Sequence, residues 1–199
     1  MEQNYKVKKM YTKLSDKKLP FIYSNNDIFE SVRERVTGGN NGCTVFVPHV
    51  CNNIDLFGAG FAAQVAEKYP SVKADYHMLG KNFLKNNFGY SQILKVFEDP
   101  KHKHQLYFVN MIAQNGTKNP KNLRPLNYFA LAKSMQTLSN HIQNNTGYKN
   151  GLEKIEIHCP KFGSGLAGGN WDFITNLIED IWSSKFFVTV YNYNPKRNR

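Results

Sequence analysis

The chain has 199 residues, of which 41% are hydrophobic and 14% aromatic, and 26 Lys and Arg against 15 Asp and Glu give it a formal charge of +11 at pH 7. This size and composition predict one globular domain with a full core, and no segment approaches the roughly 18 apolar residues of a membrane span. The lysine-rich start also lacks the apolar segment of a signal peptide. We therefore expect an intracellular, cytoplasmic protein with no membrane partner.

Much of the excess positive charge lies at the two ends of the chain, in KVKKMYTKLSDKK and in PKRNR. We interpret residues 1–18 as a basic extension, 19–194 as the folded domain and 195–199 as a basic tail. Such charge attracts nucleic acid and equally a small phosphorylated ligand, and its position at the ends makes nucleic-acid binding a secondary expectation. Abundant asparagine and lysine fit an AT-rich genome, viral ones included, so an infected host cell is an alternative setting.

The cysteines and histidines do not predict a metal site. Cys43, Cys51 and Cys159 are odd in number and show no CxxC spacing, which argues against a disulfide framework and a zinc knuckle. His102 and His104 lie in the hydrophilic stretch EDPKHKHQ, which is typical of a solvated hairpin tip. The sequence therefore predicts neither a metal nor a cofactor.

The first half of the chain alternates strand and helix signals. A short strand is expected in 19–27, and 28–36 has helical apolar spacing. The β-branched run CTVFVPHVC, residues 43–51, predicts a buried strand of a parallel sheet. A helix follows in 61–79, and Pro70 predicts a break or kink in it.

The second half continues the alternation. Two strand candidates, 90–99 and 102–114, are separated by a charged tip and predict a hairpin or adjacent strands. They are followed by a helix (125–145), a strand (152–160), a second helix (171–182) and a final strand (186–193). This order predicts an α/β domain of three layers, with helices on both faces of a mostly parallel mixed sheet. A binding crevice is expected beyond the carboxyl ends of the strands.

Two glycine-rich loops are expected at that edge of the sheet. The segments NNIDLFGAG (52–60) and FGSGLAGGN (162–170) each follow a strand and lead into a helix. Glycines permit close backbone approach, and a helix N-terminus presents N–H groups and a positive dipole end to an anion. Each loop alone is equally explained as a tight turn before a helix. Together they favour a site that holds a diphosphate from both sides.

Four segments in this order resemble the macro domain, a family that binds ADP-ribose. They are HVCNNIDLFGAGFAAQVAEKYP (49–70), YFVNMIAQ (107–114), YFALAKSM (128–135) and CPKFGSGLAGGNWDFI (159–174), and the resemblance extends over about residues 20–193. It is closest to the branch of ADP-ribose 1''-phosphate phosphatases and the terminal ADP-ribose glycohydrolase. The resemblance implies a three-layer α/β/α macro-domain sandwich.

The resemblance also implies a set of ligand contacts. Asp27 is similar to the acidic residue that accepts a hydrogen bond from the adenine amino group, with Ile28 packed beside it, although Asp27 equally fits the N-cap of the next helix. Near the adenine it places Tyr191 and Asn192, for which packing is the alternative. The two phosphate and ribose loops correspond to Asn52, Gly58, Ala59 and Gly60, and to Gly163, Ser164, Gly165, Leu166 and Ala167.

His49 and Asp55 are the candidate catalytic residues. His49 matches the strand-terminal histidine of the phosphatase branch, and a histidine with a near-neutral pKa can transfer protons or attack phosphate. Asp55, in the following loop, is expected to orient His49 or to activate water. The alternatives are a His49 that is only hydrogen-bonded at a strand end and an Asp55 that caps the loop and faces solvent. The glycohydrolase uses a lysine after the strand matching YFVNMI and an aspartate where this chain has Ala167. Since this chain has neither, its lysyl-adduct mechanism is not expected here.

The resemblance leads to a first hypothesis of an ADP-ribose 1''-phosphate phosphatase that needs no metal. The alternatives are a non-catalytic module that binds ADP-ribose or an ADP-ribosylated protein, and a hydrolase of ADP-ribosyl esters. A nucleic-acid binder that uses the basic ends is a fourth reading.

Overall fold

A computed structural model describes residues 21–38, 42–144 and 154–192, and the predicted basic extension, 1–18, and basic tail, 195–199, lie outside these ranges. Six strands form one sheet in the order β1-β6-β5-β2-β4-β3. The strands are β1 (Phe21–Ser24), β2 (Cys43–Asn52), β3 (Ser91–Asp99), β4 (His104–Gln114), β5 (Lys154–Pro160) and β6 (Phe187–Tyr191). All neighbouring strands are parallel except β3 and β4, which form an antiparallel pair. The predicted mostly parallel mixed sheet is confirmed.

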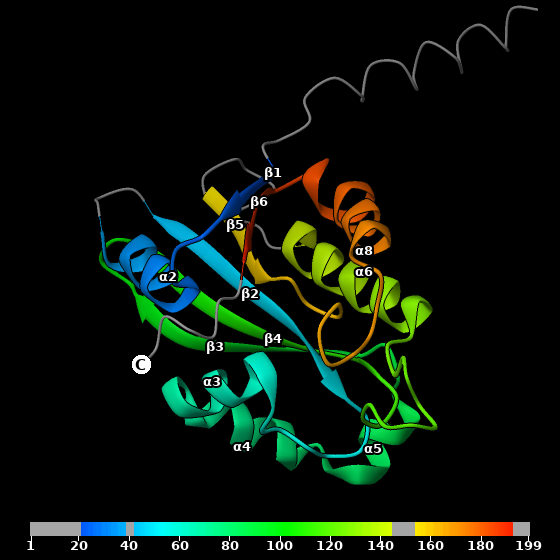
Figure 1. The fold of residues 1–199 in the computed structure, drawn as a ribbon. Coiled ribbons are helices and arrows are strands. Elements are labelled where there is room, and N and C mark those ends of the chain that lie inside the picture. The colour runs from blue at the N-terminus through cyan, green and yellow to red at the C-terminus, as the bar shows by residue number, and fades with distance from the viewer. Residues whose placement is uncertain (1–20, 39–41, 145–153, 193–199) are drawn as a thin grey trace, which may run out of the picture.

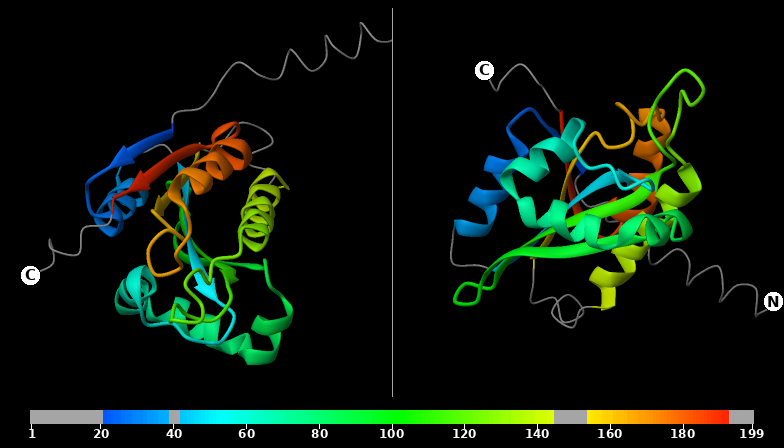
Figure 2. Two further views of the ribbon diagram at one scale, coloured as in Figure 1. Left: turned by 45° about the vertical axis from the view of Figure 1, so that its right-hand side comes forward. Right: turned by 90° about the horizontal axis from the view of Figure 1, so that it is seen from below.

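Helices cover both faces of this sheet, as Figures 1 and 2 show. The helices are α2 (Ile28–Thr37), α3 (Gly60–Lys68), α4 (Pro70–Met78), α5 (Gly80–Asn86), α6 (Tyr128–Asn144), α8 (Trp171–Ile178) and the π-helical turn η1 (Glu179–Ser183). One hydrophobic core lies between the sheet and α6, α8 and η1. A second core lies between the other face of the sheet and the helices α2, α3, α4 and α5. The predicted three-layer α/β/α sandwich is therefore confirmed.

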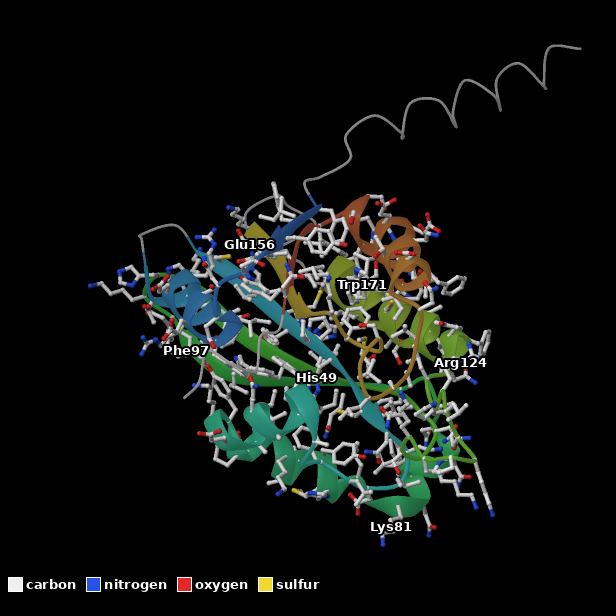
Figure 3. The ribbon with its side chains drawn as sticks, in the orientation of Figure 1. His49, Lys81, Phe97, Arg124, Glu156 and Trp171 are labelled. Carbon is white, nitrogen blue, oxygen red and sulfur yellow. The ribbon has the colours of Figure 1, made fainter. Side chains whose placement is uncertain are left out.

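Strand β2 lies at the centre of this arrangement and carries the first loop. Nine of its ten residues are buried, as expected for a strand covered on both faces. Its side chains alternate between the two cores, so that Val45 and Val47 pack toward α2 to α5 while Phe46 packs toward α6. His49 has the same parity as Val47 and therefore faces the layer of α3 and α4 (Figure 3).

The helix boundaries agree with the predicted signals in part. Pro70 separates α3 from α4 as the first residue of α4, because proline fits the first turn of a helix and not its interior. Helix α5 was not predicted, since GKNFLKN carries little apolar periodicity and buries only Leu84. The predicted helix 171–182 ends its α-helical part at Ile178 and continues as η1.

The prediction of a fully solvated tip around residues 102–104 is wrong in one respect. His102 lies in the tip and pairs with Asp99 through its Nδ1, 2.8 Å from Oδ2. His104 instead begins β4, is buried, and accepts a hydrogen bond from the backbone N–H of Cys43 at Nδ1. Within the described ranges, no three His, Cys, Asp or Glu side chains gather to hold a metal ion. No helix in the same ranges is long and apolar enough to span a bilayer.

Candidate functional site

Both glycine-rich loops border one cavity of about 900 Å³ at the carboxyl ends of β2 and β5. These strands are adjacent and parallel, so their ends meet at the same edge of the sheet. The cavity brings together ten of the predicted site residues: His49, Asn52, Asp55, Gly58, Ala59, Gly60, Gly163, Gly165, Leu166 and Ala167. The expected crevice and the convergence of the two loops are therefore present.

The glycines of the second loop have different roles. Gly163 and Gly168 have φ angles of 75° and 69°, in the left-handed region that favours glycine. A Cβ on Gly168 would lie 2.6 Å from the carbonyl oxygen of Leu123, and a Cβ on Gly169 would lie 2.8 Å from that of Gly163. Gly165 alone among the four has no atom within 4 Å of such a Cβ, and it lines the cavity. Gly165 is thus the glycine whose missing side chain leaves room for a ligand.

The second loop does not present its glycines at a helix N-terminus, as the sequence led us to expect. Helix α8 begins only at Trp171, and the side chain of Asn170 caps it by accepting a hydrogen bond from the N–H of Phe173 at 3.0 Å. The turn at Gly163 and Gly165 instead follows directly on β5 and closes through N–H of Gly168 to O of Gly165 at 3.0 Å. The turn at Gly163 and Gly165 therefore lines the cavity, whereas the N-terminus of α8 does not.

Asn52 organises the first loop from within. Its Oδ1 accepts hydrogen bonds from the N–H groups of Ile54 and Leu56, at 3.0 and 3.2 Å, and its Nδ2 donates to the carbonyl of Leu56. The Tyr76 hydroxyl of α4 donates to the Asn52 carbonyl at 2.8 Å. Helix α3 begins at Gly60, so this loop does end at a glycine-bearing helix N-terminus as predicted. The side chain of Asn52 is thus committed to shaping the loop.

Three lysines in the cavity wall were missed by the sequence reasoning. Lys73 of α4, Lys118 of the loop after β4 and Lys161 at the end of β5 line the cavity, against one carboxylate, Asp55, among the described lining residues. The ammonium of Lys161 lies 5.5 Å from the centre of the Tyr23 ring and 5.7 Å from that of Trp171. These lysines are far apart in sequence, and only the fold gathers them into a wall that attracts anions.

His49 is buried more deeply than a proton-transfer role at neutral pH suggests. Its side chain is 1% exposed and packs edge-on against Phe57 and Phe61, with ring centres 5.7 and 5.6 Å away. Burial lowers the pKa of His49 to about 4. Its Nε2 has no hydrogen-bond partner among the described residues. The expected near-neutral pKa is therefore wrong, and His49 is an uncharged imidazole in this cavity wall.

The burial of His49 predicts a pH dependence of stability. Since the folded-state pKa of about 4 lies below the ordinary value of 6.5, protonation favours the unfolded state, and stability falls as the pH drops through this window. We expect His49 to reduce the free energy of unfolding by about 2 kcal/mol between pH 7 and pH 5. Urea unfolding of the wild type and His49→Phe at both pH values measures the difference. An equal loss in both proteins would contradict a neutral, buried His49.

Asp55 contacts a histidine other than the one we expected. Its Oδ1 lies 2.6 Å from Nδ1 of His77, in the last turn of α4, and both residues line the cavity. The expectation that Asp55 orients His49 is therefore wrong. His77 was missed because no local motif marks it, and only the docking of α4 against the first loop brings it to the site.

Five predicted contact residues do not line the cavity. Asp27 caps α2 by accepting the N–H of Glu30 at 2.9 Å, which confirms the capping alternative. Tyr191 is bonded through its hydroxyl to Nδ1 of His158 at 2.8 Å, and Asn192 donates to Oδ1 of Asn25. The five are Asp27, Ile28, Ser164, Tyr191 and Asn192. Their contact with a ligand stays a prediction.

The arrangement was compared with known proteins. No family model matches the sequence. Among solved structures, a protein of unknown function from Bacteroides thetaiotaomicron superposes with a TM-score of 0.67 at 25% identity, over 89% of this chain and 100% of that one. A macrodomain protein from Streptomyces coelicolor superposes with a TM-score of 0.60 at 24% identity, over 88% and 100%. The chain therefore has the macrodomain fold.

Three other proteins are also similar to this chain. Thermosipho africanus DarTG, solved in complex with ADP-ribose, has a TM-score of 0.58 at 17% identity, over 94% of this chain and 43% of that one. A protein of Lodderomyces elongisporus named ADP-ribose 1''-phosphate phosphatase is 26% identical over 153 residues, covering 75% of this chain and 88% of that protein. An uncharacterised 17.5 kDa protein of bacteriophage T4 is 27% identical over 150 residues, covering 75% and 86%.

Proposed function

We propose that this macro domain binds ADP-ribose and hydrolyses the phosphate ester of ADP-ribose 1''-phosphate. The observation that carries the proposal is the cavity of about 900 Å³ between two loops whose lining glycines, Gly58 and Gly165, leave open space beside the backbone. Its volume lies within the usual range for small-molecule sites. The diphosphate would lie between the loops, where backbone N–H groups bind phosphate oxygens.

The charge of the cavity wall supports a ligand with more than one phosphate group. The described wall has a net charge of about +2, from three lysines, Lys73, Lys118 and Lys161, and one carboxylate, Asp55. A diphosphate neutralises this excess, so the charge of the wall fits both ADP-ribose and its phosphate ester. The name of the Lodderomyces relative agrees with this substrate class.

His49 is proposed to orient the attacking water. Its Nε2 is unpaired and buried, so a water reaches it only when the rings of Phe57 and Phe61 shift, and the uncharged imidazole then accepts a hydrogen bond from that water. The attack itself needs little base strength, because phosphate monoesters react through a loose transition state.

Phosphate release from ADP-ribose 1''-phosphate, measured beside calorimetric titration of unmodified ADP-ribose, tests this proposal. We expect the wild type to bind ADP-ribose and to release phosphate over many turnovers. The variant His49→Gln is expected to retain ADP-ribose affinity and to release phosphate at least about tenfold more slowly. A wild type that binds no ADP-ribose would remove the proposed function entirely.

Binding without turnover is the second candidate. It is favoured by the burial of His49, whose side chain is 1% exposed and is held by Phe57 and Phe61. In that case the macro domain would retain ADP-ribose or an ADP-ribosylated protein, and the same assay would show tight binding with no phosphate release. Cleavage of ADP-ribosyl esters is tested by the same cavity variants with an ester substrate.

The partners and setting follow from the same proposal. A cytoplasmic enzyme on a nucleotide-derived metabolite fits the sequence-based expectations, and nucleic-acid binding by the basic ends remains secondary. A steep salt dependence separates the two modes, since phosphate-backbone contacts weaken strongly with salt whereas a buried nucleotide pocket retains affinity.

A further inference from the structure

The Asp55–His77 pair is the histidine–carboxylate pair of the described cavity wall. Nδ1 of His77 lies 2.6 Å from Oδ1 of Asp55, and the side chains are 38% and 18% exposed. Both residues line the cavity, whereas the pairs His102–Asp99 and His158–Glu156 do not. A histidine that donates Nδ1–H to a carboxylate has a fixed tautomer and orientation, and its Nε2 becomes the atom that exchanges a proton with a ligand.

The first loop positions Asp55 independently of His77. Asp55 has a φ angle of 64°, which is uncommon for a residue other than glycine. The N–H groups on either side of it, of Ile54 and Leu56, are both held by Oδ1 of Asn52. Tyr76, next to His77 on α4, donates its hydroxyl hydrogen to the carbonyl of Asn52. Helix α4 therefore contacts the first loop through two successive residues: Tyr76 donates a hydrogen bond to Asn52, and His77 pairs with the carboxylate of Asp55.

A cation lies on the same face of α4 as His77. Lys73 precedes His77 by four residues, a spacing that puts two side chains on one helix face, and both line the cavity. An ammonium group there favours the placement of a phosphate within reach of His77. Helix α4 thus carries both a cation that can bind phosphate, Lys73, and a side chain that can transfer a proton, His77.

We propose that His77, held by Asp55, donates the proton to the leaving oxygen when the phosphate ester is hydrolysed in this cavity. The inference rests on the proposed phosphatase function. The phosphorus–oxygen bond to the ribose breaks, the ribose oxygen takes the proton from Nε2 of His77, and the water oxygen forms the new bond to phosphorus. The water proton carried by the product phosphate then returns to His77, so that no other reactant is needed. Asp55 is the positioning residue of this step.

The division of roles between two histidines supports the proposal. His49 is buried and uncharged, and so it does not supply the proton that the leaving oxygen needs. A donor for the leaving group has to come from another side chain, and His77 is the other histidine of the described cavity wall. Acid and base functions are commonly separated in this way by two different environments.

The whole 199-residue chain is tested as wild type, His77→Gln, His77→Gly, Asp55→Asn and His102→Gln. The control His102→Gln breaks a similar pair, 2.8 Å between His102 Nδ1 and Asp99 Oδ2, in the β3–β4 tip. We expect His77→Gln to lower kcat for phosphate release by about 100-fold or more, and Asp55→Asn by about tenfold or more. The Kd for unmodified ADP-ribose is expected to stay within about threefold in both, and the control to behave as wild type. Added imidazole is expected to restore part of the activity of His77→Gly.

Three outcomes separate this inference from the proposed function. A wild-type kcat in His77→Gln overturns the role of His77 and leaves the phosphatase proposal in place. Loss of ADP-ribose affinity together with kcat, without rescue by imidazole, shows a structural pair and also overturns it. Binding of ADP-ribose by the wild type with no phosphate release overturns the phosphatase proposal, and the proton-donor role with it.

Discussion

Replacing Gly165 or Gly58 with valine is expected to lower the affinity for ADP-ribose by about 100-fold, equivalent to about 3 kcal/mol, without unfolding the protein. A Cβ at either position meets no protein atom within 4 Å, and neither glycine has a positive φ angle, so the fold has room for the side chain. Both residues line the cavity from opposite loops. The added methyl groups would therefore occupy the space that the ligand needs beside the backbone.

Calorimetric titration of ADP-ribose and thermal unfolding of the same samples measure these two effects. Ala74→Val is the matched control, because Ala74 is exposed on α4 and does not line the cavity. We expect the control to bind normally. Wild-type affinity in both glycine-to-valine variants would show that the ligand does not lie against these loops.

Replacing Glu156 with glutamine is expected to destabilise the protein by about 2–3 kcal/mol, although Glu156 lies outside the cavity. Its carboxylate, 10% exposed, accepts two hydrogen bonds from Arg35 at 2.8 and 2.9 Å. It also lies 2.9 Å from Nζ of Lys154 and 3.0 Å from Nε2 of His158. The variant leaves these groups without their counter-charge. Because Arg35 is partly exposed, water offsets some of the loss that a fully buried pair would suffer.

The pKa of Glu156 adds a pH signature to this prediction. Burial raises the pKa of Glu156, but hydrogen bonds from His158, Arg35 and Lys154 outweigh it and hold the pKa below its ordinary value. The stabilisation is therefore present above about pH 4.5 and is lost as the pH falls below that value. Urea unfolding at pH 7 and at pH 3.5 is expected to show a smaller difference between wild type and Glu156→Gln at the lower pH.

Glu98→Gln provides the control for Glu156. Glu98 also pairs with a lysine, Lys95, at 2.6 Å, but on the surface, where solvent screens the pair. Its unfolding midpoint is expected to equal that of the wild type. Equal destabilisation of both variants would mean that the buried network around Glu156 contributes no more to the free energy of unfolding than the exposed Lys95–Glu98 pair.

The order of the elements and the two loops could be predicted from local sequence patterns. The β-branched run of β2 and the apolar spacing of α6 mark their own structure, because burial on two faces or on one stripe leaves a period in the sequence. Adjacent parallel strands then place their following loops at one edge, which is why 52–60 and 162–170 were expected to meet.

The roles of individual side chains could not be predicted in the same way. The pairing of Asp55 with His77 joins residues 22 positions apart, and it depends on how α4 docks against the first loop. The pKa of His49 depends on Phe57 and Phe61, which exclude water from its ring. Neither the Asp55–His77 pair nor the pKa of His49 leaves a periodic pattern in the sequence, because both depend on packing between different elements.

The sequence by itself therefore determined the three-layer α/β architecture, the position of the crevice and the presence of two glycine loops. Only the tertiary structure decided which glycine leaves ligand space, which histidine is buried and uncharged, and which lysines share a wall. The physical reason is that secondary structure follows from local periodicity, whereas burial, electrostatic environment and hydrogen-bond partners depend on residues that are distant in the chain.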